Sequence, residues 1–458
     1  MQDTTQRDIQ HIIDEQRRFF ATHQTKDLKF RRTQLKKLKQ MVLKHEKAIA
    51  EALYADLHKS YEEAYLTEIS ILLQEIDQHL KNLDRWAKPE RVVSPVALMP
   101  SGSYIYKEPL GVSLIISPWN YPFQLLINPL VAAISTGCTA VLKPSPYVKN
   151  FEKLIVRLIG ETFDPKYIAI THGGREVNQL LLAERWDFIF FTGSPYLGKI
   201  VMKAAAEHLT PVVLELGGKS PCIVDQSAHI KVAANRIVWG KLINAGQTCI
   251  APDYLFVHQS VKAQLIEELK KAIAKQYGDD PKASPYFPRI ISAANVERLK
   301  GLMKDGKIVA GGSVDEVERY IEPTLIDEVE PDFPIMQQEI FGPLLPIMTF
   351  ESIDTVLDYV NAHEKPLAFY YFGNNKSAED VLRRSTSGGG CINDTLMHIV
   401  NHHLPFGGVG NSGMGTYHGK ESFNAFTNRR AIVKTPARID LPLKYAPFKY
   451  FKMVKRML

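Results

Sequence analysis

The sequence has no apolar run that approaches the roughly 20 residues of a membrane-spanning helix. Its first 20 residues are charged and lack the apolar core of a signal peptide. Cysteine is scarce: the four residues lie far apart and form no C-x-x-C pair, which is untypical of a disulfide framework or a zinc site. These absences predict a cytoplasmic protein whose thiols are reduced.

A large excess of charge of one sign is missing too. The 56 Lys and Arg residues face 50 Asp and Glu residues, which leaves a formal net charge of +6. The basic stretch 26–47 carries Leu35, Leu38 and Val42 at helical spacing, so we interpret its charges as the wet face of an amphipathic helix. We therefore predict no nucleic acid partner.

At 458 residues, with 45% hydrophobic residues, the chain can form two or three globular domains.

Short apolar runs alternate with helical segments through most of the chain, after a largely helical stretch at 1–88. The first set of such runs lies at 112–116, 138–143, 167–170, 187–191 and 211–215. The second set lies at 222–224, 254–257, 344–347 and 367–371. This alternation is typical of α/β units with doubly wound parallel sheets, whose ligands bind beyond the carboxyl ends of the strands.

Cys249 lies at a junction between predicted elements. It follows an apolar helical run that ends at Ile243 and precedes the apolar run 254–257, with Gly246 and Pro252 marking a turn. Such a junction suits a reactive thiol at a cleft. The alternative is that Cys249 is a small buried hydrophobe, as free cysteines often are.

Two further segments supply groups that would complete covalent acyl chemistry. Glu215 ends an apolar strand before a Gly-Gly turn, where burial would raise its pKa and make it a base for water. Asn120 follows a buried strand, and its amide can donate to a developing oxyanion. A nucleophile, a base and an oxyanion donor from three segments fit a covalent mechanism.

These strings, with Phe191-Thr-Gly-Ser194, Glu339-Ile-Phe-Gly-Pro343 and Leu404-Pro-Phe-Gly-Gly408, resemble the aldehyde dehydrogenase superfamily in the family's order over nearly the whole chain. The chain looks most similar to the class-3 or fatty aldehyde branch, through Gly240-Lys241, the string after Cys249, and 410–423. The resemblance implies an α/β fold with two doubly wound parallel-sheet domains and a β-hairpin oligomerisation arm.

The resemblance also implies a domain organisation. Residues 1–88 and 106–217 would form an NAD(P)-binding domain, and 218–412 a catalytic domain that carries the thiol. Residues 89–105 and 424–437 would form a bridging hairpin that reaches another subunit. The short N-terminus resembles the dimeric branch, so a homodimer is expected.

The resemblance places NAD or NADP at the first sheet. Ser194 suits a helix N-cap and Pro195 the first helical position, so a helix through 204–206 would present its amino end to a pyrophosphate. Glu339 would bind the nicotinamide ribose and Phe341 would support the ring. The implied cofactor residues are Ser117, Pro118, Trp119, Lys143, Ser145, Gly193, Ser194, Gly198, Leu216, Gly217, Glu339 and Phe341.

Pro146 departs from the family pattern, which usually has a glutamate there, two residues after the Pro that follows Lys143. The missing glutamate would have accepted from ribose hydroxyls and repelled a 2′-phosphate, so its absence predicts a weakened preference for NAD.

The string 408–413 matches G-x-G-x-x-G, but no predicted strand precedes it, so we do not assign it to phosphate binding. His402 and His403 lack a third spaced ligand, and no metal site is predicted.

The reaction implied is oxidation of an aldehyde to a carboxylic acid. Cys249 would attack the carbonyl, Asn120 and the Cys249 N–H would hold the oxyanion, a hydride would pass to the nicotinamide, and Glu215 would activate water to hydrolyse the thioester. One alternative is an acylating enzyme that uses coenzyme A, against which the intact Glu215 counts. The other is a non-catalytic structural protein on the same fold.

Aromatic content and an apolar, basic tail indicate a hydrophobic aldehyde, medium- or long-chain or aromatic. Tyr65, Tyr121 and Phe406 are the candidate substrate contacts. The tail, 438–458, interleaves apolar residues with lysines, which suits a peripheral membrane contact. We favour the simpler interpretation, a helix that closes over the substrate mouth or the partner subunit.

Overall fold

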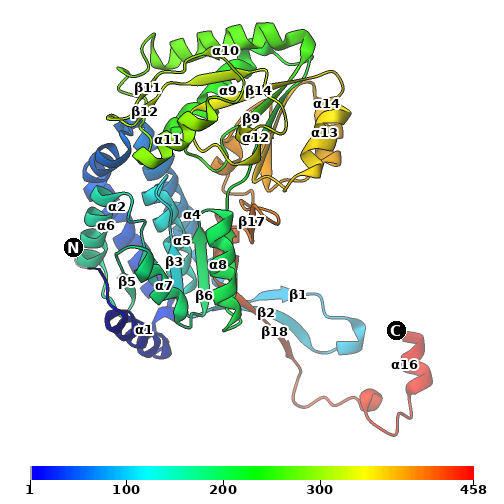
Figure 1. The fold of residues 1–458 in the computed structure, drawn as a ribbon. Coiled ribbons are helices and arrows are strands. Elements are labelled where there is room, and N and C mark those ends of the chain that lie inside the picture. The colour runs from blue at the N-terminus through cyan, green and yellow to red at the C-terminus, as the bar shows by residue number, and fades with distance from the viewer. Residues whose placement is uncertain (1–2, 458) are drawn as a thin grey trace.

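The N-terminal part of the chain is helical, as predicted. The computed structural model describes residues 3–457 (Figure 1). The helices here are α1(Gln6–Ala21), α2(Leu28–Leu57), α3(Tyr61–Ala64) and α4(Ser70–Ala87), with a π-helical turn η2(Tyr65–Ile69) before α4. Leu35, Leu38 and Val42 of α2 are completely buried, which confirms that the basic stretch is the solvent face of an amphipathic helix.

The first sheet has the strand order β17-β7-β6-β3-β4-β5 and is parallel except for β17. Its strands are β3(Val112–Ile116), β4(Thr139–Lys143), β5(Ile168–Ile170), β6(Phe188–Thr192), β7(Val212–Glu215) and β17(Gly413–Met414). The helices that connect the parallel strands are α5(Pro122–Thr136), α6(Lys149–Thr162), α7(Arg175–Ala183) and α8(Pro195–Ala206). The chain passes from β3 outward to β5 and then returns to β6 on the other side, so the switch point lies between β3 and β6.

The second sheet has the order β10-β13-β14-β9-β8-β15-β16 and lies above the first in Figure 1. Its predicted strands are β8(Pro221–Val224), β9(Tyr254–His258), β14(Leu344–Phe350) and β15(Ala368–Phe372). Its remaining strands are β10(Lys307–Ala310), β13(Thr324–Asp327) and β16(Gly389–Ile392), and a separate pair is formed by β11(Val314–Asp315) and β12(Tyr320–Ile321). The main helices here are α9(Ile230–Leu242), α10(Lys262–Tyr277), α11(Ala293–Leu302), α13(Ile353–Ala362) and α14(Asn375–Arg384). The fold class predicted from the sequence is confirmed.

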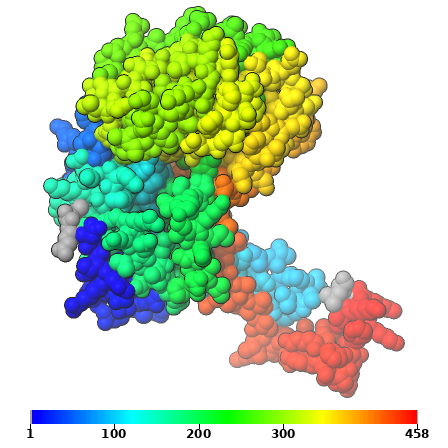
Figure 2. All heavy atoms as spheres, viewed as in Figure 1, coloured from blue at the N-terminus to red at the C-terminus, as the bar shows by residue number. Residues whose placement is uncertain are grey.

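A three-stranded antiparallel sheet projects from the body of the molecule (Figures 1 and 2). It consists of β1(Glu90–Val92), β2(Gly102–Pro109) and β18(Thr427–Lys434), and β2 pairs with β18 along its whole length. The strand β2 therefore runs beyond 105, where the predicted hairpin ends. The tail and its helix α16(Phe451–Met457) lie beyond this arm. No helix in residues 3–457 is long and apolar enough to cross a membrane.

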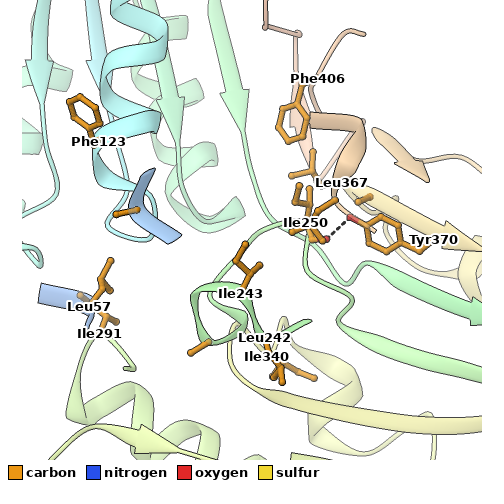
Figure 3. Close-up of a cluster of buried hydrophobic side chains, with 14 of the residues drawn as sticks. Leu57, Phe123, Leu242, Ile243, Ile250, Ile291, Ile340, Leu367, Tyr370 and Phe406 are labelled. Carbon is orange, nitrogen blue, oxygen red and sulfur yellow. Dashed lines mark hydrogen bonds between the residues drawn. The ribbon is translucent and has the colours of Figure 1, made fainter. Parts of the chain in front are cut away.

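Apolar side chains pack around the segment that carries Cys249 (Figure 3). Ile243 precedes that residue and Ile250 follows it, and both are buried. The Tyr370 hydroxyl, from β15, donates to the Ile250 carbonyl oxygen over 2.6 Å. The segment that carries Cys249 is therefore anchored to the core of the second sheet.

Candidate active site

A strained turn lies three residues before Cys249, in the segment between α9 and β9. Asn244 and Ala245 have left-handed φ angles of 53° and 52°, in the short turn η4(Ile243–Gly246). Gly246 follows with φ 75°, and a Cβ there would clash with the Gly342 carbonyl oxygen. Non-glycine residues keep such angles only where the surrounding structure enforces them, which is common at functional sites.

Cys249 and Glu215 line one cavity of about 600 Å³. The two residues come from different sheets: Glu215 ends β7, and Cys249 precedes β9. The wall is mainly apolar and includes Leu66, Ile71, Tyr121, Leu125, Trp239, Ile243, Tyr277, Leu396, Met397, Ile399, Val400, Phe406 and Tyr417. The arrangement offers a thiol and a carboxyl group to one apolar ligand.

The Glu215 carboxyl group has no hydrogen-bond partner, and both of its oxygens are buried. Burial raises its pKa well above the ordinary value, in the direction that the sequence predicts. The buried site therefore favours the neutral carboxyl group over the ionised one. In its ionised form it would be a strong base for a water molecule in the cavity.

Burial also raises the pKa of the Cys249 thiol, and the Glu339 and Glu215 carboxylates raise it further. The surrounding protein therefore favours the neutral thiol. Activation needs either a positive charge beside the sulfur or a base that accepts the thiol proton. An oxidised nicotinamide carries such a positive charge.

Asn120 is tied to the nucleophile segment by its side chain and its backbone. Its Nδ2 donates to the Gln247 carbonyl oxygen over 3.1 Å, and its carbonyl oxygen accepts from Asn244 Nδ2 over 2.8 Å. The Tyr121 hydroxyl lies 2.7 Å from Thr248 Oγ1. An asparagine amide has two N–H donors, so one remains for an oxyanion.

Replacement of Asn120 by alanine tests this interpretation. We expect kcat to fall about 10²–10³-fold, because an oxyanion donor stabilises the transition state more than the bound substrate. The KM for the cofactor should change less than threefold. Initial rates at saturating aldehyde measure the effect, and an unchanged kcat would remove Asn120 from the chemistry.

The candidate cofactor residues gather at the switch point of the first sheet. Ser117, Pro118 and Trp119 follow β3, whereas Gly193 and Ser194 follow β6. The Ser194 hydroxyl accepts from Leu197 N over 3.4 Å and Pro195 is the first residue of α8, which confirms the predicted helix start. The amino end of a helix at such a crevice is suited to a pyrophosphate.

Three features of this crevice fit a dinucleotide. Ser117 Oγ is buried without a hydrogen-bond partner. A Cβ at Gly198 would lie 2.6 Å from the Leu216 side chain, and one at Gly217 would clash with the Glu339 carboxylate. Glycine at both positions leaves room for the Leu216 and Glu339 side chains in their present positions. The residues present can hold NAD or NADP.

Lys143 and Ser145 lie at the end of β4, on the other side of β3. The Lys143 side chain is buried and donates to the Pro144 carbonyl oxygen over 2.7 Å. Burial lowers its pKa to about 8, and the Glu152 carboxylate opposes that shift. Ser145 Oγ accepts from Tyr147 N over 3.4 Å. Lys143 keeps further N–H donors for ribose hydroxyls.

Glu339 and Phe341 reach the same crevice from the second sheet. Burial, followed by the Asp253 carboxylate, raises the pKa of Glu339 to about 8. The Phe341 ring packs edge-on to the Trp119 ring at 5.4 Å between centroids, and its φ of 50° is left-handed. The two sheets thus bring together candidate cofactor residues that are more than 200 positions apart.

Tyr65 does not line the cavity, unlike Tyr121 and Phe406. Its ring stacks on Tyr61 at 6.3 Å, and the following residues of the π-helical turn η2, Leu66 and Thr67, line the cavity instead. The substrate contact that the resemblance implied for Tyr65 is therefore not formed by this side chain at the cavity wall.

Sequence reasoning missed most of the apolar wall. Leu66, Trp239 and Met397 contribute large side chains from three separate elements. The exposure of Leu66 and Trp239, 65% and 36%, is known only from the structure, so the sequence carried no signal for them. Such residues often mark a binding surface, but singly they are common and uninformative.

His402 has neighbours that the sequence did not reveal. Its Nδ1 lies 3.0 Å from Glu75 Oε2, and ligand-type atoms of Glu75, His402 and His418 lie within 4.8 Å of one another. The Glu75 carboxylate already accepts from His79 Nε2 over 3.1 Å and from Gly419 N over 2.8 Å. We interpret Glu75, His79 and His402 as a hydrogen-bonded cluster that fixes the 402–419 loop on α4, whereas the ring nitrogens of His418 have no hydrogen-bond partner among residues 3–457.

Comparisons with known proteins agree on one family. The profile of the aldehyde dehydrogenase family matches residues 1–432. The 4,4'-diaponeurosporen-aldehyde dehydrogenase of Staphylococcus aureus is 49% identical over 451 residues, which cover 98% of each chain. The dimeric, NADP-preferring aldehyde dehydrogenase of Canis lupus familiaris is 43% identical over 437 residues, which cover 95% of this chain and 96% of that one.

Solved structures show the same similarity. The substrate-bound state of Staphylococcus aureus AldH superimposes with a TM-score of 0.96 at 48% identity, and the match covers 98% of this chain and 99% of that chain. A glyceraldehyde-3-phosphate dehydrogenase from Methanocaldococcus jannaschii in complex with NADP has a TM-score of 0.84 at 23% identity, covering 95% and 96% of the two chains. The second match shows a shared fold.

Proposed function

The chain belongs to the aldehyde dehydrogenase family and oxidises aldehydes with NAD or NADP, and we propose that its substrate is a hydrophobic aldehyde. We further propose that Cys249, Asn120 and Glu215 are its catalytic residues. The single observation that supports this most directly is that Cys249 and Glu215 line one apolar cavity. In this assignment 1–88 and 106–217 bind the cofactor, and 218–412 supply the thiol.

The proposed steps follow from the residues present. Cys249 loses its thiol proton to solvent, and its Sγ then bonds to the carbonyl carbon of the aldehyde while the free Asn120 N–H donates to the oxygen that becomes negative. A bound nicotinamide would supply the hydride acceptor, and loss of the hydride would leave a thioester on Cys249. Glu215 then takes a proton from water, and the hydroxide attacks the thioester on Cys249 to release the carboxylic acid. The water that enters supplies the second oxygen of the acid.

A series of straight-chain aldehydes tests the substrate class. Each methylene that enters the apolar cavity is worth about 0.8 kcal/mol, so kcat/KM should rise about fourfold per added carbon until the cavity is filled. The Staphylococcus aureus relative is named for 4,4'-diaponeurosporen-aldehyde, so that compound belongs in the panel. Values of kcat/KM that fall with chain length would contradict the proposal.

Product analysis with coenzyme A in the assay distinguishes hydrolysis of the thioester from the acylating alternative. With Glu215 in place, the product should be the free acid whether or not coenzyme A is present. An acyl-coenzyme A product would overturn the assignment of Glu215. The non-catalytic alternative is set aside, because the relatives are aldehyde dehydrogenases and the chain retains the cysteine, the asparagine and the glutamate.

The cofactor preference depends on Pro146. Because no carboxylate stands at this position, NADP should be used at a kcat/KM within about tenfold of that for NAD. We expect Pro146→Glu to lower kcat/KM for NADP about tenfold or more, since like charges brought together cost several kcal/mol, and to leave NAD use nearly unchanged. A strong preference of the unaltered enzyme for NAD would contradict this prediction.

The arm and the tail support a homodimer. Strands β1, β2 and β18 project from the body, and within residues 3–457 no residue of the tail beyond them lines the cavity of its own chain. Phe448 and Phe451 are exposed in this tail beside Lys449 and Lys452. We propose that the tail covers the partner's substrate mouth, with contact to an acidic membrane as the alternative. The cytoplasmic location stays a prediction.

Deletion of 447–458 tests the tail. We expect oxidation of short aldehydes to be unchanged, whereas kcat/KM for long-chain aldehydes falls about tenfold because apolar cover is lost. Sedimentation with vesicles of acidic lipid should give the same bound fraction for both forms. Loss of vesicle binding with unchanged long-chain activity would support the membrane alternative instead.

A further inference from the structure

An ion pair between Lys59 and Glu68 is completely buried beside the active site. Lys59 Nζ lies 2.6 Å from Glu68 Oε1, and both side chains have 0% exposure. A buried ion pair loses so much hydration that it is weak evidence for a stabilising role by itself. Its further contacts indicate what else it does.

Glu68 holds the amino end of α5. Its second oxygen, Oε2, accepts from Phe123 N over 2.9 Å and from Gln124 N over 3.2 Å, in the first turn of the helix. Tyr121, at the N-cap position, supplies no side-chain cap of its own. The carboxylate therefore satisfies two N–H groups that otherwise have no partner at a helix start.

Lys59 holds the two residues that come before this helix. Its Nζ donates to the Asn120 carbonyl oxygen over 3.3 Å and lies 4.2 Å from the centroid of the Tyr121 ring. Apart from their contact with each other, the charged groups of the pair make their hydrogen bonds to the segment from Asn120 to Gln124. The pair therefore holds this segment through two separate contacts.

We propose that the Lys59–Glu68 pair is a positioning device for Asn120, and that it affects the rate only through the direction of the Asn120 amide. The inference rests on the oxyanion role proposed above for Asn120. Misplacement of a catalytic group by about 1 Å can cost on the order of 10²-fold in rate. Neither residue of the pair needs to touch the substrate.

Kinetics of Glu68→Gln and of Lys59→Met/Glu68→Gln test the proposal. The double variant removes both charges and so leaves no unpaired buried charge. We expect kcat to fall about tenfold or more in each, with the KM for the cofactor unchanged. When the same changes are made in an Asn120→Ala background, kcat should fall less than twofold further, because the group that they position is already gone.

Asp56 offers a matched control. It is 7% exposed and caps α6 as Glu68 caps α5, accepting from Asn150 N over 3.1 Å and from Phe151 N over 2.8 Å. It makes no hydrogen bond to the segment 120–124. Asp56→Asn should lower the melting temperature as Glu68→Gln does, yet leave kcat within twofold of the unaltered enzyme.

The outcomes distinguish the oxyanion role of Asn120 from the positioning role of the Lys59–Glu68 pair. If Asn120→Ala lowers kcat but the pair variants keep full activity, only the positioning proposal fails. It fails as well if the losses from the pair and from Asn120 multiply, or if Asp56→Asn lowers kcat as much as Glu68→Gln. If Asn120→Ala has no effect, the oxyanion assignment falls and the positioning role with it.

Discussion

Replacing Cys249 by alanine should abolish aldehyde oxidation, with kcat reduced by a factor on the order of 10⁴ or more. Removal of a catalytic nucleophile ends the covalent route, and losses of up to about 10⁶ are known for such changes. No other cysteine lines the cavity. Reduction of NAD in the presence of aldehyde measures the effect. Cys249→Ser should be nearly as inactive, because a hydroxyl is a far weaker nucleophile than a thiol.

Cys391→Ala is the control for this change. Cys391 is also partly exposed, and its Sγ lies 3.5 Å from His398 Nδ1, but it belongs to β16 and lies outside the cavity wall. Its replacement should leave turnover unchanged. Undiminished turnover by Cys249→Ala, or loss of turnover only in Cys391→Ala, would move the chemistry away from the proposed site.

Replacing Glu215 by glutamine should stop the reaction after one turnover. The thiol still forms the thioester and one equivalent of hydride is still transferred, but water is no longer activated. We expect a burst of reduced cofactor equal to the enzyme concentration, followed by a steady rate lower by about 10²–10⁴. Stopped-flow absorbance measures both phases. A steady rate that is unaffected would exclude Glu215 as the base.

The burial of Glu215 should also make the free energy of unfolding depend on pH. Because the pKa of Glu215 is raised in the folded protein, the folded state holds its proton more tightly than the unfolded state does. The associated stability is fully present below the ordinary carboxyl pKa and is lost as pH rises through the raised value. Glu215→Gln removes this dependence, so its free energy of unfolding should fall less with rising pH. Denaturant unfolding at acidic and alkaline pH measures the difference.

The parallel sheets were predictable because their signal is local. The runs at 112–116 and 187–191 are apolar throughout, as strands buried on both faces must be, and they appear as β3 and β6. The start of α8 was equally predictable, since the preferences for Ser194 as N-cap and Pro195 as first helical residue are local in the sequence. Strands such as β10 and β16 were missed because their sequences are short and mixed.

The burial of Glu215, the proposed base, was predictable for a similar reason. Glu215 stands at the end of an apolar strand, so its burial and the direction of its pKa shift follow from its neighbours in the chain. The sequence did not indicate the raised pKa of Cys249. That shift depends on burial and on Glu339 and Glu215, which come from other elements.

By itself, then, the sequence determined which elements form, where strands end, and which side chains are available for chemistry at those ends. Only the tertiary structure decided what surrounds them: the apolar wall of the cavity, the turn that moves Tyr65 away from it, and the clamp of Lys59 and Glu68 on the Asn120 segment. The physical reason is range. Periodicity and capping act between neighbours in the chain, whereas a cavity or a buried ion pair exists only after distant segments have packed and excluded water.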